Sequence, residues 1–347
     1  MKILSFLFCY CLLIFSSNSF CKGIVIADEK FQLLRFETVD TMEIVKFADS
    51  ISMNYTKVIL HLGTDYVFNK GNIYFEPIRQ KNLQVFSNRL AKNKTKLYLW
   101  FLDAYGNDQF QKIYSNHSSI ITTVSKKIKE LNLLYSGVYI DLEWINDGAK
   151  VERANNSKLV EILKFLENSF STKEIGFFCS LIDSEKVNHK RGYSFDLIKQ
   201  TRAYPIVMLY IKDGGFYFEN NEIQPYLNDI RLTELKAFYN QHKWETCISL
   251  ESAWIVKDKN EVISLRLNPE EVIRLKKNII PENKKKYNFF ILNQYTISSD
   301  ILIKQKNRKD VLLSKTSTVW SMKVNEILID ADNFLWEYYS LQTPGWR

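Results

Sequence analysis

Apolar runs alternate with segments of helical periodicity along most of the chain. The apolar runs are nearly continuous, which is typical of parallel strands buried on both faces, whereas half-exposed strands alternate polar and apolar residues. Eight segments have this strand pattern: 32–36, 57–63, 96–104, 137–144, 174–182, 206–211, 246–254 and 287–296. Seven segments between them are compatible with helices: 40–52, 81–91, 118–131, 157–169, 194–199, 232–242 and 268–279.

Eight strands that alternate with helices in a chain of 347 residues predict an α/β fold, the (β/α)8 TIM barrel. A doubly wound sheet is the alternative, but it would usually have a glycine-rich phosphate-binding turn after an early strand, and the chain has none. The segment after Ser299 is less regular. Residues 316–322 and 324–329 are predicted to form a C-terminal hairpin on the barrel, or else 316–322 is the true eighth strand.

The first nineteen residues have the pattern of a secretory signal peptide. A basic start is followed by an apolar run over 3–15 and by small polar residues, with Ser17 and Ser19 at positions that suit cleavage after Ser19. The apolar run is too short to span a membrane. We therefore expect a secreted or periplasmic protein without stable membrane insertion, in which residues 20–347 form a single domain.

The net charge and the positions of cysteine and histidine indicate which partners and cofactors to expect. The formal net charge is +8, with its densest basic run at 284–286, but no nucleic-acid-binding module is recognisable, so no nucleic-acid partner is expected. Three cysteines remain after cleavage, and an odd number argues against a disulfide framework. The four histidines are scattered without metal-binding spacing, so we expect neither a metal site nor a cofactor.

The segment over 135–144, Tyr-Ser-Gly-Val-Tyr-Ile-Asp-Leu-Glu-Trp, contains the strongest candidate chemistry. Residues two apart on a strand share a face, so Asp141 and Glu143 should point to the same side where the strand ends. Two carboxylates held close together favour retention of one proton, which makes one of them a usable general acid. The alternative is a strand end at which both acids are solvated or paired with cations.

This segment resembles the fourth-strand signature of glycoside hydrolase family 18, the chitinase-type enzymes. That signature reads Asp-Gly-x-Asp-x-Asp-x-Glu, with the glutamate as general acid. Gly137, Asp141 and Glu143 match it, whereas Ser136 and Tyr139 stand where the family has its first two aspartates.

A second resemblance lies about two strands later. Family 18 barrels have Met-x-Tyr-Asp at the end of the sixth strand, and this chain has Met208 and Tyr210 in that pattern, followed by Ile211 in place of the aspartate. The resemblance implies a TIM barrel that acts on glycans containing N-acetylglucosamine, such as a β-linked polymer or an N-glycan core.

The resemblance also implies roles for three residues in a substrate-assisted mechanism. Glu143 would protonate the glycosidic oxygen, while the N-acetyl group of the substrate attacks the anomeric carbon. Asp141 would orient and polarise that acetamide, and Tyr210 would hydrogen-bond its oxygen.

Other candidate substrate-binding residues are expected at the carboxyl ends of the strands, where TIM barrels have their active sites. Aromatic rings suit the apolar faces of sugars, and amides and carboxylates suit the hydroxyl groups. These candidates are Tyr105, Tyr139, Trp144, Met208, Glu251, Trp254, Asn293 and Gln294. For the tryptophans, core packing is the alternative role, and Tyr139 either closes the acetamide pocket or fills the barrel core.

Two other functions fit the same residues. A retaining glycosidase could use Glu143 as acid/base and Glu251, on the seventh strand, as nucleophile, although Leu142 precedes the acid where that group usually has asparagine. A glycan-binding, chitinase-like protein without turnover is the third hypothesis. Glu143 favours an enzyme, whereas the absence of acids at Ser136, Tyr139 and Ile211 favours the binding protein.

Overall fold

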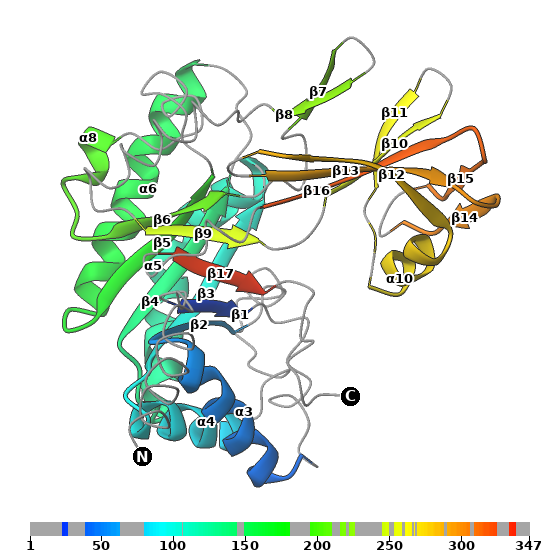
Figure 1. Cartoon of the computed structure of the whole chain (residues 1–347). Helices are drawn as coiled ribbons and strands as arrows, with labels where there is room; N and C mark the ends of the chain where they lie inside the picture. The colour runs from blue at the N-terminus through cyan, green and yellow to red at the C-terminus, as the bar shows by residue number, and fades with distance from the viewer. Residues whose placement is uncertain are drawn as a thin grey trace, which may run out of the picture.

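A computed structural model provides the structure of the chain (Figure 1). It describes residues 23–26, 39–62, 80–105, 107–143, 149–180, 195–209, 216–219, 222–225, 245–249, 253–258, 261–265, 267, 269–287, 290–305, 309–324 and 333–337. The predicted signal peptide, the predicted first strand at 32–36 and the predicted helix at 232–242 lie outside these residues.

Eight parallel strands close into a barrel in the order β1-β17-β9-β6-β5-β4-β3-β2. They are β1 (Gly23–Ile26), β2 (Lys57–His61), β3 (Lys96–Tyr105), β4 (Gly137–Glu143), β5 (Glu174–Ser180), β6 (Tyr204–Leu209), β9 (Glu245–Ser249) and β17 (Asn333–Glu337). All eight neighbouring pairs are parallel. The predicted TIM barrel is therefore confirmed.

Amphipathic helices cover the outside of the barrel (Figure 1). They are α3 (Thr41–Asn54), α4 (Gln80–Lys92), α5 (Asn107–Glu130), α6 (Ala149–Ser169) and the short α8 (Phe195–Ile198). In α3, Ile44, Phe47, Ala48 and Ile51 have helical spacing and are all buried. The helix begins where the Asp40 side chain accepts a hydrogen bond from the backbone N–H of Met42.

The last strand of the barrel lies further along the chain than the sequence predicted. The segment predicted as the seventh strand, 246–254, contains parts of two strands. The first, β9, ends at Ser249, and the second, β10 (Ala253–Asp258), belongs to another sheet. The predicted eighth strand corresponds to β13 (Phe290–Ile297), which belongs to that same sheet. The eighth barrel strand is β17, and the first is β1, which precedes the predicted 32–36.

Residues 253–324, between β9 and β17, form a separate antiparallel sheet with its own helix, which we call the insertion. The sheet has the strand order β11-β10-β16-β13-β12. Its further elements are β11 (Glu261–Leu265), α10 (Pro269–Lys277), β12 (Ile279–Lys286), β14 (Ile301–Ile303), β15 (Val311–Leu313) and β16 (Thr318–Val324). Because β16 pairs with both β10 and β13, it is a central strand of this sheet instead of half of the expected hairpin on the barrel.

Figure 1 shows the insertion on the side toward which the arrows of β9 and β17 point, which is the carboxyl end of the barrel. A small hairpin, β7 (Phe216–Glu219) and β8 (Glu222–Pro225), follows β6. The carboxyl end is where TIM barrels hold their active sites, so the insertion lies beside the region of interest.

Candidate active site

The interior of the barrel is filled with side chains that come from alternate positions of its strands. They form one buried cluster: Val25, Ile59, Tyr98, Trp100, Tyr139, Phe178, Ile206, Met208 and Cys247. The described part of the barrel interior is therefore packed with side chains, and in such barrels the chemistry lies at the ends of the strands.

Tyr139 lies in the middle of this cluster and is fully buried. Its ring makes edge contacts with Tyr98 and Tyr204, with centroid distances of 5.5 and 6.0 Å. Gly176 lies opposite Tyr139 in the register, and a Cβ atom there would come within 2.3 Å of Cε1 of the tyrosine. Of the two roles expected for Tyr139, the structure therefore supports the filling of the barrel core.

Asp141 follows on the same face of β4, nearer the carboxyl end. Its side chain is only 2% exposed, and its backbone lies in register with Asp103 of β3 and Phe178 of β5. Burial of a carboxylate is costly in free energy, so an inward-facing aspartate at this depth indicates a specific polar site.

Glu143 is the last residue of β4, and its backbone is in register with Tyr105, the last residue of β3. The register of β4 with β3 is regular from Ile140 to Glu143, so position 143 lies on the same face of the strand as position 141. The structure describes the backbone of Glu143 and Tyr105 but not their side chains. Trp144, Tyr210 and Glu251 lie wholly outside the described residues.

Met208 of the second motif is buried in the same interior cluster. It lies in register with Ser180 of β5 and with Cys247 of β9. Only β5 separates β6 from β4. Asp141 and Met208 therefore lie on the same inner face of the barrel, on strands that only β5 separates.

Three candidate residues lie in the insertion instead of at the end of a barrel strand. Trp254 is buried on β10 and packs near Tyr295 in the core of the insertion. On β13, Asn293 donates a hydrogen bond to Ser321 at 3.2 Å and Gln294 donates one to Glu282 at 3.1 Å. Their assignment to barrel strands was wrong, because strands covered on both faces are equally apolar in a parallel barrel and in this sheet.

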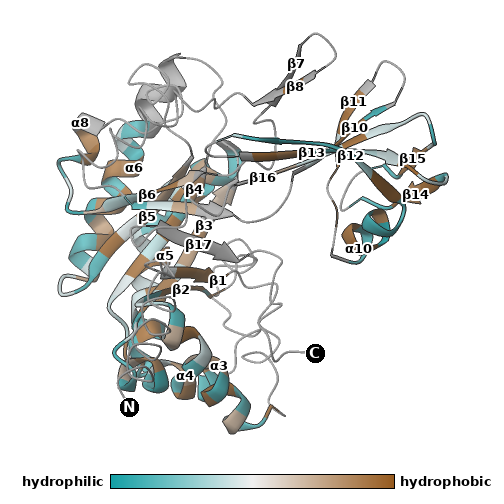
Figure 2. Ribbon diagram, in the orientation of Figure 1, coloured by the Kyte–Doolittle hydropathy of each residue, from teal (hydrophilic) through white to brown (hydrophobic). Residues whose placement is uncertain are grey.

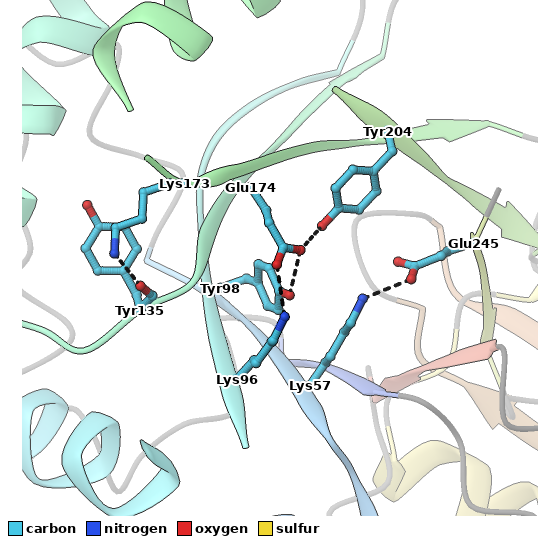
Figure 3. Close-up of polar contacts among 8 residues, drawn as sticks. All are labelled: Lys57, Lys96, Tyr98, Tyr135, Lys173, Glu174, Tyr204 and Glu245. Carbon is cyan, nitrogen blue, oxygen red and sulfur yellow. Dashed lines mark hydrogen bonds and ion pairs between the residues drawn. The ribbon is translucent and has the colours of Figure 1, made fainter. Parts of the chain in front are cut away.

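The amino end of the barrel holds a polar network that the sequence analysis did not identify (Figure 3). Glu174, the first residue of β5, accepts hydrogen bonds from Tyr204 at 2.8 Å, Tyr98 at 2.9 Å and Lys96 at 3.0 Å. Lys57 forms an ion pair with Glu245 at 2.9 Å across the β2 and β9 ends. The only signal in the sequence is that each of these strands begins with a polar residue or a tyrosine.

Protonation in this network follows from burial and charge. Burial acts to raise the pKa of Glu174, but the hydrogen bonds from Tyr204, Lys96 and Tyr98 outweigh it, so the net pKa is lowered. Burial raises the pKa values of Tyr98 and Tyr204, so both phenols remain hydrogen-bond donors at neutral pH. The network therefore closes the amino end of the barrel with a carboxylate held by neutral and cationic donors.

At the opposite end of β2, His61 is buried and its ring centroid lies 4.0 Å from that of Trp100. Across the described residues, no group of three or more His, Cys, Asp or Glu is arranged to hold a metal ion. Cys179 and Cys247 are both buried and reduced. None of the helices that the structure describes is long and apolar enough to cross a membrane.

Comparison with known proteins identifies the fold. No family model and no curated protein matches the chain in sequence. Among solved structures, a chitinase from Chromobacterium violaceum matches 92% of this chain and 94% of its own, with a TM-score of 0.54 and 11% identity. The spore cortex-lytic enzyme SleL of Bacillus megaterium matches 93% of this chain and 72% of its own, with a TM-score of 0.54 and 12% identity.

A family 18 chitinase from Cycas revoluta matches 92% of this chain and 94% of its own, with a TM-score of 0.52 and 11% identity. At such low identity these matches concern the fold, and the fold agrees with the resemblance seen around Asp141 and Met208. The chain therefore has the TIM-barrel fold of the chitinases of glycoside hydrolase family 18.

Proposed function

We propose that this protein is a secreted glycoside hydrolase that cleaves glycans containing N-acetylglucosamine, with Glu143 as the general acid. The observation that carries the proposal is the buried carboxylate of Asp141 on the inner face of β4, two residues before Glu143 ends the strand. A chitinase-type fold supports it, since active sites in such barrels lie at this end.

In the proposed mechanism, Glu143 donates its proton to the glycosidic oxygen as the bond to the anomeric carbon breaks. The acetamide oxygen of the substrate attacks that carbon and forms a cationic oxazolinium ion. Asp141 accepts a hydrogen bond from the acetamide N–H and stabilises the positive charge of the oxazolinium ion. This electrostatic attraction is stronger in the low dielectric of a buried site. Tyr210 hydrogen-bonds the acetamide oxygen as the ring forms. Water then attacks the anomeric carbon and gives a proton to the Glu143 carboxylate, while the bond from that carbon to the acetamide oxygen breaks and the acetamide is restored.

The residue two positions before Asp141 on β4 carries no charge. Tyr139 is neutral, because complete burial raises its pKa well above the ordinary value. A neutral ring at position 139 does not repel a negative charge at position 141, whereas a carboxylate there would. Asp141 therefore has no anionic neighbour two residues before it on its own strand.

The same Tyr139 gives some support to a glycan-binding protein without turnover. Its ring occupies barrel interior where the family signature has an aspartate, so no carboxylate can relay a proton through that position. The Cycas revoluta chitinase has been solved with (GlcNAc)3, which makes N-acetylglucosamine oligomers suitable ligands for testing both functions.

Hydrolysis of a fluorogenic N,N′-diacetylchitobioside by the protein without residues 1–19 tests the proposal. We expect Glu143→Gln to lower kcat by about 10²–10⁴-fold while oligosaccharide binding persists. Glu251→Gln is the matched control and should retain activity.

Each other result has a defined meaning. Unchanged hydrolysis in Glu143→Gln would exclude its role as general acid. Equal losses in both variants would support the two-carboxylate mechanism instead. Tight binding of (GlcNAc)3 without turnover in the unsubstituted protein would identify a glycan-binding barrel.

Secretion is tested separately. Sequencing of the amino end of the exported protein should give Phe20 as its first residue.

A further inference from the structure

The excess positive charge of the chain is confined to the insertion. The whole chain has 47 Lys and Arg and 39 Asp and Glu, whereas residues 253–324 alone have 15 and 7. Subtraction leaves 32 basic and 32 acidic residues in the remainder of the chain. The net charge of +8 therefore belongs to one structural unit instead of being a general property of the sequence.

The β14–β15 ribbon of the insertion is apolar on both of its faces. Ile301, Ile303 and Leu313 are buried against the core of the insertion. On the opposite face, Leu302 and Leu312 are 45% and 60% exposed and lie directly opposite each other in the register. Solvent-facing positions of a half-buried ribbon are normally polar, so this exposed leucine pair is unusual.

Basic residues flank the two strands of the leucine pair along the chain. Lys304 follows β14 directly, Lys309 lies shortly before β15, and Lys315 lies shortly after it, and all three are exposed. The connection over 304–310 contains four Lys and Arg and one Asp. The backbone N–H of Lys304 donates to the carboxylate of the buried Glu271 on α10 at 3.3 Å, which ties the ribbon to the helix.

Exposed apolar side chains are concentrated in the same unit. Of eight large apolar side chains exposed in the described part of the chain, five belong to the insertion: Val262, Ile273, Ile280, Leu302 and Leu312. Figure 2 shows the hydrophobic colour of β14 beside α10, which has both hydrophobic and hydrophilic segments, at the far end of the insertion from the barrel. Apolar and basic groups thus occur together there.

We propose that the outer face of the β14–β15 ribbon adsorbs to an anionic lipid surface. Lysines are attracted to acidic headgroups, and leucines gain free energy when they enter the boundary between headgroups and acyl chains. An acidic polysaccharide would engage the lysines but gain little from two aliphatic side chains, because sugars pack best on aromatic rings and the ribbon has none. The adsorption is peripheral and does not depend on glycosidase activity.

Flotation of the protein without residues 1–19 with lipid vesicles tests this proposal. One set of vesicles is pure phosphatidylcholine, and the other contains phosphatidylcholine and phosphatidylglycerol at three to one. We expect binding to the anionic vesicles, weakened by added salt and by Lys304→Gln with Lys309→Gln. Leu302→Asn with Leu312→Asn should lower the partition coefficient about tenfold or more, because two partly inserted leucines are lost.

Matched controls come from the barrel helices. Met42 and Met53 on α3 are also exposed apolar residues, and Lys126 and Lys129 on α5 are exposed lysines. Met42→Asn with Met53→Asn, and Lys126→Gln with Lys129→Gln, should leave binding unchanged, and circular dichroism shows whether every variant is folded.

Three outcomes would overturn the proposal. The first is no flotation with anionic vesicles, and the second is equal flotation with neutral ones. The third is binding that the leucine variants leave intact and that soluble heparin competes away, which would identify a polyanion site instead. None of these outcomes bears on hydrolysis, so the proposal stands or falls separately from the proposed function.

Discussion

At the scale of single residues, the pairing of Tyr139 with Gly176 decides how the barrel interior is filled. A large ring at one position requires the absence of a side chain at the other, which lies opposite on the next strand. The sequence suggested two roles for Tyr139, and nothing near it in the chain distinguishes them, because the residue that does so lies 37 positions later. The shared face of positions 141 and 143 was easier to predict, since the alternation of a single strand sets it.

This pairing predicts the effect of a small change. Gly176→Ala should lower the free energy of unfolding by about 1–3 kcal/mol, because the added methyl group would lie 2.3 Å from Cε1 of Tyr139 and the packed core cannot easily yield. Urea denaturation measures the effect. Tyr139→Leu, which removes that ring atom, should make Gly176→Ala nearly neutral in the double variant, and additive losses would contradict the proposed contact.

Glu174 at the amino end predicts a dependence of stability on pH. Its pKa in the folded protein is lowered overall, because the hydrogen bonds from Tyr204, Lys96 and Tyr98 outweigh the effect of burial. Such a group stabilises the fold above its unfolded pKa of about 4.3, and the stabilisation is lost as the pH falls through the lower folded value. We therefore expect the free energy of unfolding to fall on acidification below about pH 4.3.

Urea denaturation from pH 7 to pH 3 measures this dependence. Tyr204→Phe removes one of the donors that lower the pKa of Glu174, so the acid-induced loss should be shallower in that variant. Thr123→Ser is a control, because Thr123 lies on α5 and its hydroxyl bonds within that helix. A loss of equal slope in Tyr204→Phe and in the unsubstituted protein would show that other carboxylates determine the acid response.

At the scale of elements, helices were predicted well where the helical spacing of apolar residues is continuous. Where polar residues interrupt that spacing, the predicted helix was too short. The prediction for α5 began at residue 118, whereas the helix begins at Asn107. Phe110 and Ile113 continue its buried face, but a run of small polar residues follows them and conceals the periodicity. The hydroxyl of Ser115 donates a hydrogen bond to the carbonyl of Gln111 one turn earlier, so this polar side chain is accommodated within the helix.

The predicted helix at 40–52 begins within one residue of α3, which starts directly after its capping residue Asp40. Asp40→Ala should lower the free energy of unfolding by about 1 kcal/mol, since the N–H of Met42 loses its acceptor. Thermal or urea denaturation measures the loss. Asp40→Ser keeps an acceptor oxygen at the cap and should restore most of the stability, and equal losses in both variants would exclude a capping role.

At the scale of the whole molecule, the barrel was predicted although its last strand was misplaced. Strands two to six follow one another with a helix between each pair, so sequence order and spatial order agree. Between β9 and β17 the insertion supplies seven strands of its own, five of them in one sheet, and an apolar run does not reveal the sheet to which it belongs. Barrel closure depends on β17 pairing with both β1 and β9, a contact between distant parts of the chain that the pattern of neighbouring residues does not contain.

Closure of the barrel is also supported by the ion pair between Lys57 and Glu245, which lie 188 residues apart. Their side chains are only 15% and 11% exposed, so each charge is largely shielded from water. Lys57→Met or Glu245→Leu alone should lower the free energy of unfolding by about 3 kcal/mol, because the remaining charge stays buried without its principal counter-ion.

The double variant shows whether the ion pair itself stabilises the fold or whether its charges are needed to align the two strands. Replacement of both residues by apolar side chains of similar size should restore stability to near that of the unsubstituted protein, because the desolvation cost of both charges is removed together. Lys96→Met is the matched control, since that lysine is more than half exposed at the same end of the barrel and its loss should cost little. Urea denaturation gives the free energy of unfolding of the unsubstituted protein and of the four variants. A double variant less stable than either single one would show that the two charges are needed to align β2 with β9 where the barrel closes.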